Sequence, residues 1–244
     1  MNESLSINLR NVTVVYNEGT PDEVVALRNV SLSVKKGETL VVTGGNGSGK
    51  STLLKTIAGT VPIKSGSVFI EGIDVTHWSP HRRANFLGFI HQDPMLGTCP
   101  SLTFHENLRL VGGGCWWWPF PERFSIPRKQ RELIESTGLP LIQKSNTMMS
   151  SLSGGQRQGA ALILALSSKR SILLMDEFTS SLDDVSKSSF WKILSAVAGR
   201  QMTILGVLHD LSGTDLLESR YIHFTNGTLD NPVSASADNN RKVY

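Results

Sequence analysis

The sequence predicts an α/β fold in which a mainly parallel sheet is flanked by helices. An apolar run leads into a glycine-rich loop, and a segment with helical spacing follows the loop. Other short apolar runs end in polar residues, as buried parallel strands do. Two earlier segments alternate apolar and polar residues, which indicates half-buried strands of a smaller sheet. The strands of both sheets are expected at residues 7–15, 30–34, 39–43, 65–70, 86–90, 172–175 and 203–208.

The glycine-rich loop fits the pattern G-x-x-x-x-G-K-[ST] between a strand and a helix that Gly59 closes. Glycines let successive backbone N–H groups turn toward a phosphate chain, and the helix N-terminus adds partial positive charge. Lys50 is expected to reach the β- and γ-phosphates, and Ser51 to offer a hydroxyl to Mg²⁺. The full phosphate loop comprises Gly44, Gly45, Asn46, Gly47, Ser48, Gly49, Lys50, Ser51 and Thr52.

Composition sets the broad class. The chain has 244 residues, 39% hydrophobic and 18% charged, which are ordinary globular values. No apolar run reaches membrane-spanning length, so we expect a cytosolic protein that reaches any membrane through a partner. A net charge of +3 with scattered basic residues does not indicate nucleic-acid binding. Cys99 and Cys115 form neither a metal-ligand pattern nor a disulfide framework, so reduced thiols are expected.

Three features of the first hundred residues bear on a site. Tyr16 ends the first strand, where its ring either stacks on a base or packs on the sheet. His81, Arg82 and Arg83 are expected on a solvated helix or turn. Gln92 follows the strand at 86–90, at the edge where ligands sit in such sheets, so its amide is a candidate Mg²⁺ ligand or water-orienting group.

The character of the chain changes between about residues 97 and 165, where we expect an inserted, mainly helical subdomain. Thr103 and Glu106 have the spacing of a capping box, and Pro127 and Gly138 frame a second helix. Between these helices stand three consecutive tryptophans, Trp116 to Trp118. They predict either a partner-contact patch or a loop whose rings cover the helices.

A second helix start with anion-binding character follows at Leu152, Ser153, Gly154, Gly155 and Gln156. Ser153 and Gln156 have capping-box spacing, and the two glycines have no side chains to cover the backbone N–H groups at this helix start. The phosphate loop lies about a hundred residues earlier, so this helix start requires a second phosphate or a second subunit.

Acidic and imidazole side chains follow the last two buried strands. Asp176 is expected to hold Mg²⁺, directly or through water, and Glu177 to face the attacking water as a general base. The segment Ser180 to Asp183 caps the next helix, and His209 follows the strand at 203–208, where it could hydrogen-bond a γ-phosphate. From Asn231 onward we expect a polar tail.

Together these motifs resemble the nucleotide-binding subunit of an ATP-binding cassette (ABC) transporter over residues 16 to 227. Leu152 to Gln156, placed shortly before the strand that ends in Asp176 and Glu177, is the specific signature; many other NTPases share the phosphate loop alone. The resemblance implies the P-loop NTPase fold, with a RecA-like parallel sheet, an antiparallel β subdomain and an inserted α-helical subdomain. In the family's terms, Tyr16 is similar to the adenine-stacking aromatic, Gln92 to the Q-loop glutamine, and His209 to the switch histidine. Asp176 and Glu177 are similar to the Walker B pair, and Asp183 lies in the D-loop.

The resemblance also implies cofactors and partners. ATP and Mg²⁺ are the expected cofactors, with Ser51, Gln92 and Asp176 around the metal. Two subunits would face each other head to tail, so that Ser153 and Gly155 of one copy complete the γ-phosphate site of a second copy or a related cassette. Integral-membrane permease subunits would hold the cassette at the cytoplasmic face of the membrane.

The function that this resemblance implies is ATP hydrolysis coupled to transport. The sequence from Gln92 to Thr103 is similar to that of bacterial importer subunits that work with a binding protein and transport amino acids or related small solutes. An exporter, a lipoprotein-releasing system and a soluble cassette of iron–sulfur cluster assembly are the alternatives. One departure concerns Phe178, because most members have proline there. Phe178 lacks the fixed φ of proline, so we expect a freer turn and altered turnover or closure.

Overall fold

The computed structural model describes residues 4–112, 126–168, 170–178, 184–198, 202–208 and 218–230. The strands are β1 (Leu5–Tyr16), β2 (Val24–Lys35), β3 (Thr39–Gly44), β4 (Ser65–Ile70), β5 (Ile73–Asp74), β6 (Leu87–Ile90), β7 (Ile172–Asp176), β8 (Thr203–Val207), β9 (Ser219–Thr225) and β10 (Thr228–Leu229). The helices are α1 (Lys50–Ala58), α2 (Pro80–Arg83), α3 (Phe104–Val111), α4 (Arg128–Ser136), α5 (Gly154–Ser167) and α6 (Asp184–Ala198), with a 3-10 turn at Met149–Ser151. The tryptophans Trp116 to Trp118 and the tail from Asn231 lie outside the described residues.

The larger sheet has six strands in the order β10-β9-β3-β8-β7-β6. All its pairs are parallel except β9 with β10, so the carboxyl ends of β3, β6, β7 and β8 meet at one edge. Alternate residues of the same strands enter two different cores. Leu40 and Leu174 belong to one core, and Val41 and Leu173 to the other. Burial of both faces explains why these strands read as continuous apolar runs, and it confirms the predicted α/β class.

The smaller sheet is antiparallel, with the strand order β2-β1-β4-β5. Strand β2 is longer than the sequence predicted, because it runs from Val24 to Lys35 rather than over 30–34. Its pairing with β1 contains register shifts near Val12 and Val14, and such bulges break the alternation from which a strand is recognised. The two-residue strands β5 and β10 are too short to carry a pattern, and the seven-residue strand β9 was also not predicted.

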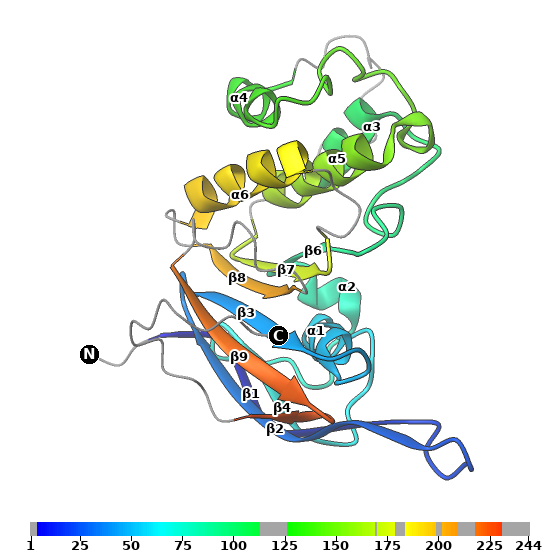
Figure 1. The fold of residues 1–244 in the computed structure, drawn as a ribbon, viewed down its shortest axis with the longest axis vertical. Coiled ribbons are helices and arrows are strands. Elements are labelled where there is room, and N and C mark those ends of the chain that lie inside the picture. The colour runs from blue at the N-terminus through cyan, green and yellow to red at the C-terminus, as the bar shows by residue number, and fades with distance from the viewer. Residues whose placement is uncertain are drawn as a thin grey trace.

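Helices α3, α4 and α5 gather at one end of the molecule, beyond the larger sheet, while α1 lies between the strands of the two sheets (Figure 1). Both capping boxes are present, at Thr103 for α3 and at Ser153 for α5. Pro127 is the N-cap of α4, and Gly138 follows its end with φ of 68°, as the sequence predicted. Helix α5 packs against strand β6 of the larger sheet as well as against α3 and α4. The predicted limits of the helical subdomain, about residues 97 and 165, therefore stay a prediction.

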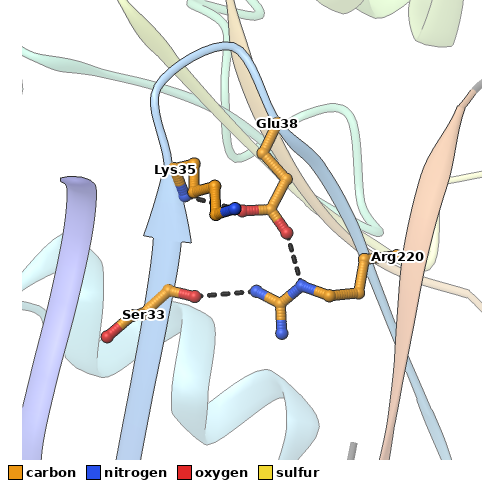
Figure 2. Close-up of polar contacts among 4 residues, drawn as sticks. All are labelled: Ser33, Lys35, Glu38 and Arg220. Carbon is orange, nitrogen blue, oxygen red and sulfur yellow. Dashed lines mark hydrogen bonds and ion pairs between the residues drawn. The ribbon is translucent and has the colours of Figure 1, made fainter. Parts of the chain in front are cut away.

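A charged cluster ties the turn between β2 and β3 to strand β9 (Figure 2). The Arg220 guanidinium donates to the Glu38 carboxylate at 2.5 Å and to the Ser33 carbonyl at 2.7 Å. The other Glu38 oxygen accepts from the backbone N–H of Lys35 at 2.6 Å. Strand β3 leads directly into the phosphate loop, so this cluster holds the base of the strand that positions the loop.

Arg83 was expected on a solvated helix or turn, and this expectation is wrong. The residue is buried, with 3% of its surface exposed. Its guanidinium donates to the carbonyls of Thr56 and Ile57 at 2.7 and 2.9 Å, and to the Thr76 carbonyl at 3.0 Å. Thr56 and Ile57 lie in the last turn of helix α1, where free acceptor positions on the carbonyls and the helix dipole both favour a cation. Burial lowers the pKa of Arg83.

Replacing Arg83 with methionine is expected to lower the free energy of unfolding by about 2–3 kcal/mol, because it removes the guanidinium that donates to the Ile57 and Thr76 carbonyls. Chemical denaturation measures the loss. Arg82→Met is the matched control, since the exposed Arg82 guanidinium only stacks over Trp78 at 3.6 Å and its loss should cost less than about 1 kcal/mol. Equal losses in the two variants would contradict a structural role for Arg83.

Candidate functional site

A cavity of about 820 Å³ opens beside the phosphate loop. Residues from both sheets and from the end of β7 meet in its wall, although they are far apart in the sequence. The lining comprises Tyr16, Val24, Val25, Ala26, Arg28, Asn46, Gly47, Ser48, Gly49, Lys50, Ser51, Thr52, Glu177, Asn226 and Gly227. The sequence predicted most of this set, namely the phosphate loop with Tyr16 and Glu177.

The loop is arranged to receive an anion. None of the described side chains caps the N-terminus of α1, whereas α3 and α5 both have capping boxes, so the first N–H groups of α1 remain available. The Lys50 ammonium donates to the carbonyls of Gly44 and Gly45 at 2.9 and 2.8 Å, which folds it over the loop. The Ser48 hydroxyl is buried and has no hydrogen-bond partner among the described residues. These groups together suit a phosphate chain.

Two glycines of the loop cannot be replaced without strain. Gly44 has φ of 144°, and a Cβ there would lie 2.3 Å from the Phe224 carbonyl oxygen. Gly49 has φ of 108°, and its Cβ would lie 2.5 Å from the Ala26 carbonyl oxygen. The loop is therefore wedged between β9 and β2, and only glycine satisfies both the backbone conformation and the close contact.

The Ser51 hydroxyl donates to a carboxylate oxygen of Asp176 at 2.9 Å. Asp176 ends β7 and is mostly buried, and burial raises the pKa of its carboxyl group, against the opposing effect of the Ser51 hydrogen bond. A desolvated carboxylate beside a hydroxyl is a hard-oxygen donor pair suited to Mg²⁺. Among the described residues, no three His, Cys, Asp or Glu side chains gather around one point. Mg²⁺ would therefore take its other ligands from nucleotide oxygens, water or an amide oxygen such as that of Gln92.

Glu177 lines the cavity, and its backbone has φ of 43°, which is unusual for a residue other than glycine. Its neighbour Phe178 is fully buried and stacks on Phe190 with ring centroids 4.2 Å apart. These contacts hold the Phe178 ring in place, and the expectation of a freer turn with altered turnover or closure stays a prediction.

Gln92 and its neighbour mark the edge of the site. Gln92 follows β6 and is exposed, and it does not line the cavity. His91, which the sequence analysis did not single out, is half-buried and stacks on Phe89 at 4.2 Å. Burial lowers the pKa of His91, and the nearby Asp176 carboxylate opposes that shift. The sequence signal for His91 was its place at the carboxyl end of a buried strand.

The flank of the cavity contains the predicted residue Tyr16 and a turn that the sequence did not indicate. The Tyr16 hydroxyl lies 3.4 Å from the Thr52 hydroxyl, so the ring stands over the helix that follows the loop. The β9–β10 turn also contacts the loop, since the Gly227 N–H donates to the Ser48 carbonyl at 2.8 Å. The dipeptide Asn226-Gly227 is a hairpin-turn signal, but nothing in it indicated contact with the phosphate loop.

The second helix start lies apart from this cavity, because none of Leu152 to Gln156 lines it. Ser153 and Gly154 are exposed, and a Cβ on Gly154 would contact nothing within 4 Å. The Gln156 amide oxygen accepts from the Lys144 ammonium at 3.1 Å and from the Ser153 N–H at 3.3 Å. The helix start is thus an ordered surface that contributes nothing to the cavity of its own chain.

The structure therefore contains three features of a nucleotide-binding cassette. They are a phosphate loop, a strand with two acidic residues at its carboxyl end, and a separate, exposed helix start that contains glycine. A family model described as ABC transporter matches residues 27–180, well over half of the chain. The chain belongs to this family. The predicted family, the P-loop cassette fold and the ATPase activity are confirmed. The chain is an ATP-binding, ATP-hydrolysing subunit of an ABC transporter.

Relatives of this ABC cassette span most of its length. It is 31% identical over 195 residues to the tyrosine transport ATP-binding protein of Clostridioides difficile, covering 79% of this chain and 77% of the relative. It is 31% identical over 238 residues to the glutamate/aspartate import ATP-binding protein GltL of Escherichia coli, covering 95% and 93%. A solved ATP-binding cassette, a dimer in a post-hydrolysis state bound to ADP and Pi, has a TM-score of 0.77 at 28% identity, covering 92% and 96%.

Two predicted site residues of the ABC cassette, Asp183 and His209, lie outside the described ranges, and so do Ser181 and Cys115. Cys99 is a free, exposed thiol. None of the helices in the described part of the chain is long and apolar enough to cross a membrane.

Proposed function

We propose that this ABC cassette hydrolyses ATP with Mg²⁺ as one of two facing copies, and that it drives a membrane permease that imports a small solute such as an amino acid. The observation that carries the import assignment is whole-length similarity to GltL, a glutamate/aspartate import protein, over 95% of this chain. The relatives named for methionine and phosphonate import point the same way. The cassette would then sit at the cytoplasmic face of the membrane through its permease.

Each side chain of the cavity receives a role from its position. The N–H groups of the phosphate loop and the Lys50 ammonium bind the β- and γ-phosphates, and the Tyr16 ring faces the base. Glu177 accepts a proton from the attacking water. Two residues outside the cavity wall, Gln92 and His209, are assigned to the γ-phosphate by the family resemblance, Gln92 as a metal or water contact and His209 as a hydrogen-bond donor.

Mg²⁺ fits the hydroxyl of Ser51 and the carboxylate of Asp176, which are already 2.9 Å apart. When bound, the ion would neutralise developing charge on the β- and γ-phosphate oxygens. Asp176 must be ionised to serve as a ligand, so its raised pKa makes metal binding weaken as the pH falls toward that pKa.

Replacing Ser51 with alanine is expected to raise the Mg²⁺ concentration needed for tight nucleotide binding by at least about 10-fold. The measurement is isothermal titration of ATP at a series of Mg²⁺ concentrations. Binding of ATP in the presence of EDTA serves as the control and should be unchanged, because Ser51 acts on the metal. An unchanged Mg²⁺ dependence would remove Ser51 from the metal site.

The exposed helix start of α5 is assigned to the nucleotide of the facing copy. Ser153 and Gly155 would donate to the γ-phosphate there, which explains why this anion site is remote from the cavity of its own chain. Asp183 lies in the segment that would approach the same interface.

Ser153→Arg is expected to abolish nucleotide-driven dimerisation while leaving ATP binding to the monomer intact, because the bulky side chain blocks the close approach of the second copy. Light scattering with ATP and Mg²⁺ measures the dimer, in the Glu177→Gln background that slows hydrolysis. Ser136→Arg is the matched control, since Ser136 is also exposed in the helical region but lies at the far end of α4. A normal dimer of Ser153→Arg would refute the assignment in trans.

The import assignment is tested through the partners. Import predicts that neighbouring genes encode a permease and a secreted solute-binding protein. The ATPase activity of the cassette assembled with that permease should rise several-fold when the binding protein and its solute are added. An ATPase activity of the cassette–permease assembly that responds only to a substrate on the cytoplasmic side would instead indicate an exporter.

A further inference from the structure

The backbone of Glu177 is held in a conformation that an L-residue seldom adopts. Its φ is 43°, and the residue carries a long charged side chain rather than the hydrogen of glycine. Such a conformation persists only where the flanking structure leaves the chain no alternative.

On the N-terminal side, the constraint comes from the sheet. Asp176 pairs in register with Val207 of β8, and its carboxylate accepts from the Ser51 hydroxyl. The Glu177 N–H then donates to the Val207 carbonyl at 3.1 Å. The strand is therefore fixed up to the nitrogen of Glu177.

On the C-terminal side, the constraint comes from an aromatic cluster of Phe178, Phe190 and Trp191, the last two on helix α6. Phe178 is completely buried, and its ring stacks on Phe190 at 4.2 Å with an interplanar angle of 24°. It also meets the Trp191 ring at 5.6 Å in an edge-on arrangement. Both partners are buried as well, so the Phe178 ring has little freedom to move.

We propose that Phe178 is a positioning residue for hydrolysis: its ring, locked in the aromatic cluster, holds Glu177 in the left-handed conformation that directs its carboxylate into the nucleotide cavity. The inference rests on the proposed role of Glu177 as general base. Phe178 contacts neither nucleotide nor metal in this account. It acts only through the direction of the Glu177 side chain, and it takes the place of a proline as the element that stiffens this turn.

A double-mutant cycle tests the inference. Phe178→Ala is expected to lower kcat about 10-fold while the dissociation constant for ATP stays within about two-fold, because misplacement of the base affects the chemical step alone. In a Glu177→Gln background, the same substitution should change the residual turnover, followed with radiolabelled ATP, by less than about two-fold. Phe178→Leu keeps most of the buried volume and should fall between Phe178→Ala and the parent, and it serves the cycle if Phe178→Ala does not fold.

Phe104→Ala is the control for a general loss of stability, because Phe104 is a fully buried ring in the separate helical core. Any effect of Phe104→Ala on turnover should be the same in both backgrounds. The inference is overturned if Phe178→Ala slows turnover by the same factor in the Glu177→Gln background as in the parent. It is also overturned if Phe178→Ala weakens ATP binding as much as it slows turnover. If Glu177→Gln alone keeps turnover within a few-fold of the parent, the assignment of Glu177 fails, and the inference falls with it. If Glu177→Gln is slow but both Phe178 variants turn over like the parent, only the inference is lost.

Discussion

Replacing Glu177 with glutamine is expected to slow ATP turnover by about 10² to 10⁴-fold, the usual contribution of a positioned general base, while ATP binding is retained. Glutamine has nearly the same shape as glutamate but cannot accept the proton of the attacking water. Glu177 lines the cavity directly after the strand residue that is bonded to Ser51, so no other described carboxylate is placed to substitute for it. Steady-state turnover and equilibrium ATP binding are the two measurements.

Glu71→Gln is the matched control for this experiment. Glu71 is also a glutamate with positive φ, at 49°, but it accepts a hydrogen bond from Ser6 at 2.8 Å and does not line the cavity. Its replacement should leave turnover within about two-fold of the parent, since neither its charge nor its backbone lies near the nucleotide. Turnover of Glu177→Gln within a few-fold of the parent would mean that Glu177 is not the base.

Lys50→Ala is expected to weaken ATP binding by about 10²-fold or more, because it removes charge-assisted hydrogen bonds to the β- and γ-phosphates. The Lys50 ammonium now donates to the Gly44 and Gly45 carbonyls, so it can exchange these contacts for phosphate oxygens without travelling far. Titration with a fluorescent ATP analogue measures the affinity.

Lys64→Ala removes the same charge from the surface, where Lys64 pairs with Glu18 at 2.6 Å outside the cavity. This control should bind ATP as the parent does, which separates a local effect of Lys50 from a change of net charge. Unchanged affinity of Lys50→Ala would contradict its assigned contact with the phosphates.

Much of the fold was predictable because its signals are local. The phosphate loop, the end of α1 at Gly59 and the capping boxes at Thr103 and Ser153 each depend on residues only a few positions apart. The buried strands β3, β7 and β8 are continuous apolar runs, because both faces of their sheet are covered.

The features that were missed depend on contacts between distant segments. Arg83 looked like a surface residue because its partners, the carbonyls that end α1, lie 26 and 27 positions earlier. From the sequence, Phe178 was interpreted only as the absence of a proline. Its packing was not predicted, because the rings that it contacts belong to the following helix. The Asn226-Gly227 turn reads as a hairpin, and only the parallel pairing of β9 with β3 brings it to the phosphate loop. None of these contacts has a local sequence signal.

The central claim is that two copies of this ABC cassette close around ATP, with the α5 helix start of each completing the site of the other. The most direct test is the molar mass of the Glu177→Gln protein in solution, measured by light scattering with ATP and Mg²⁺ and again without nucleotide. The Glu177→Gln protein is expected to be a dimer with ATP and a monomer without it. A protein that binds ATP but stays monomeric at every concentration would contradict closure of two identical copies.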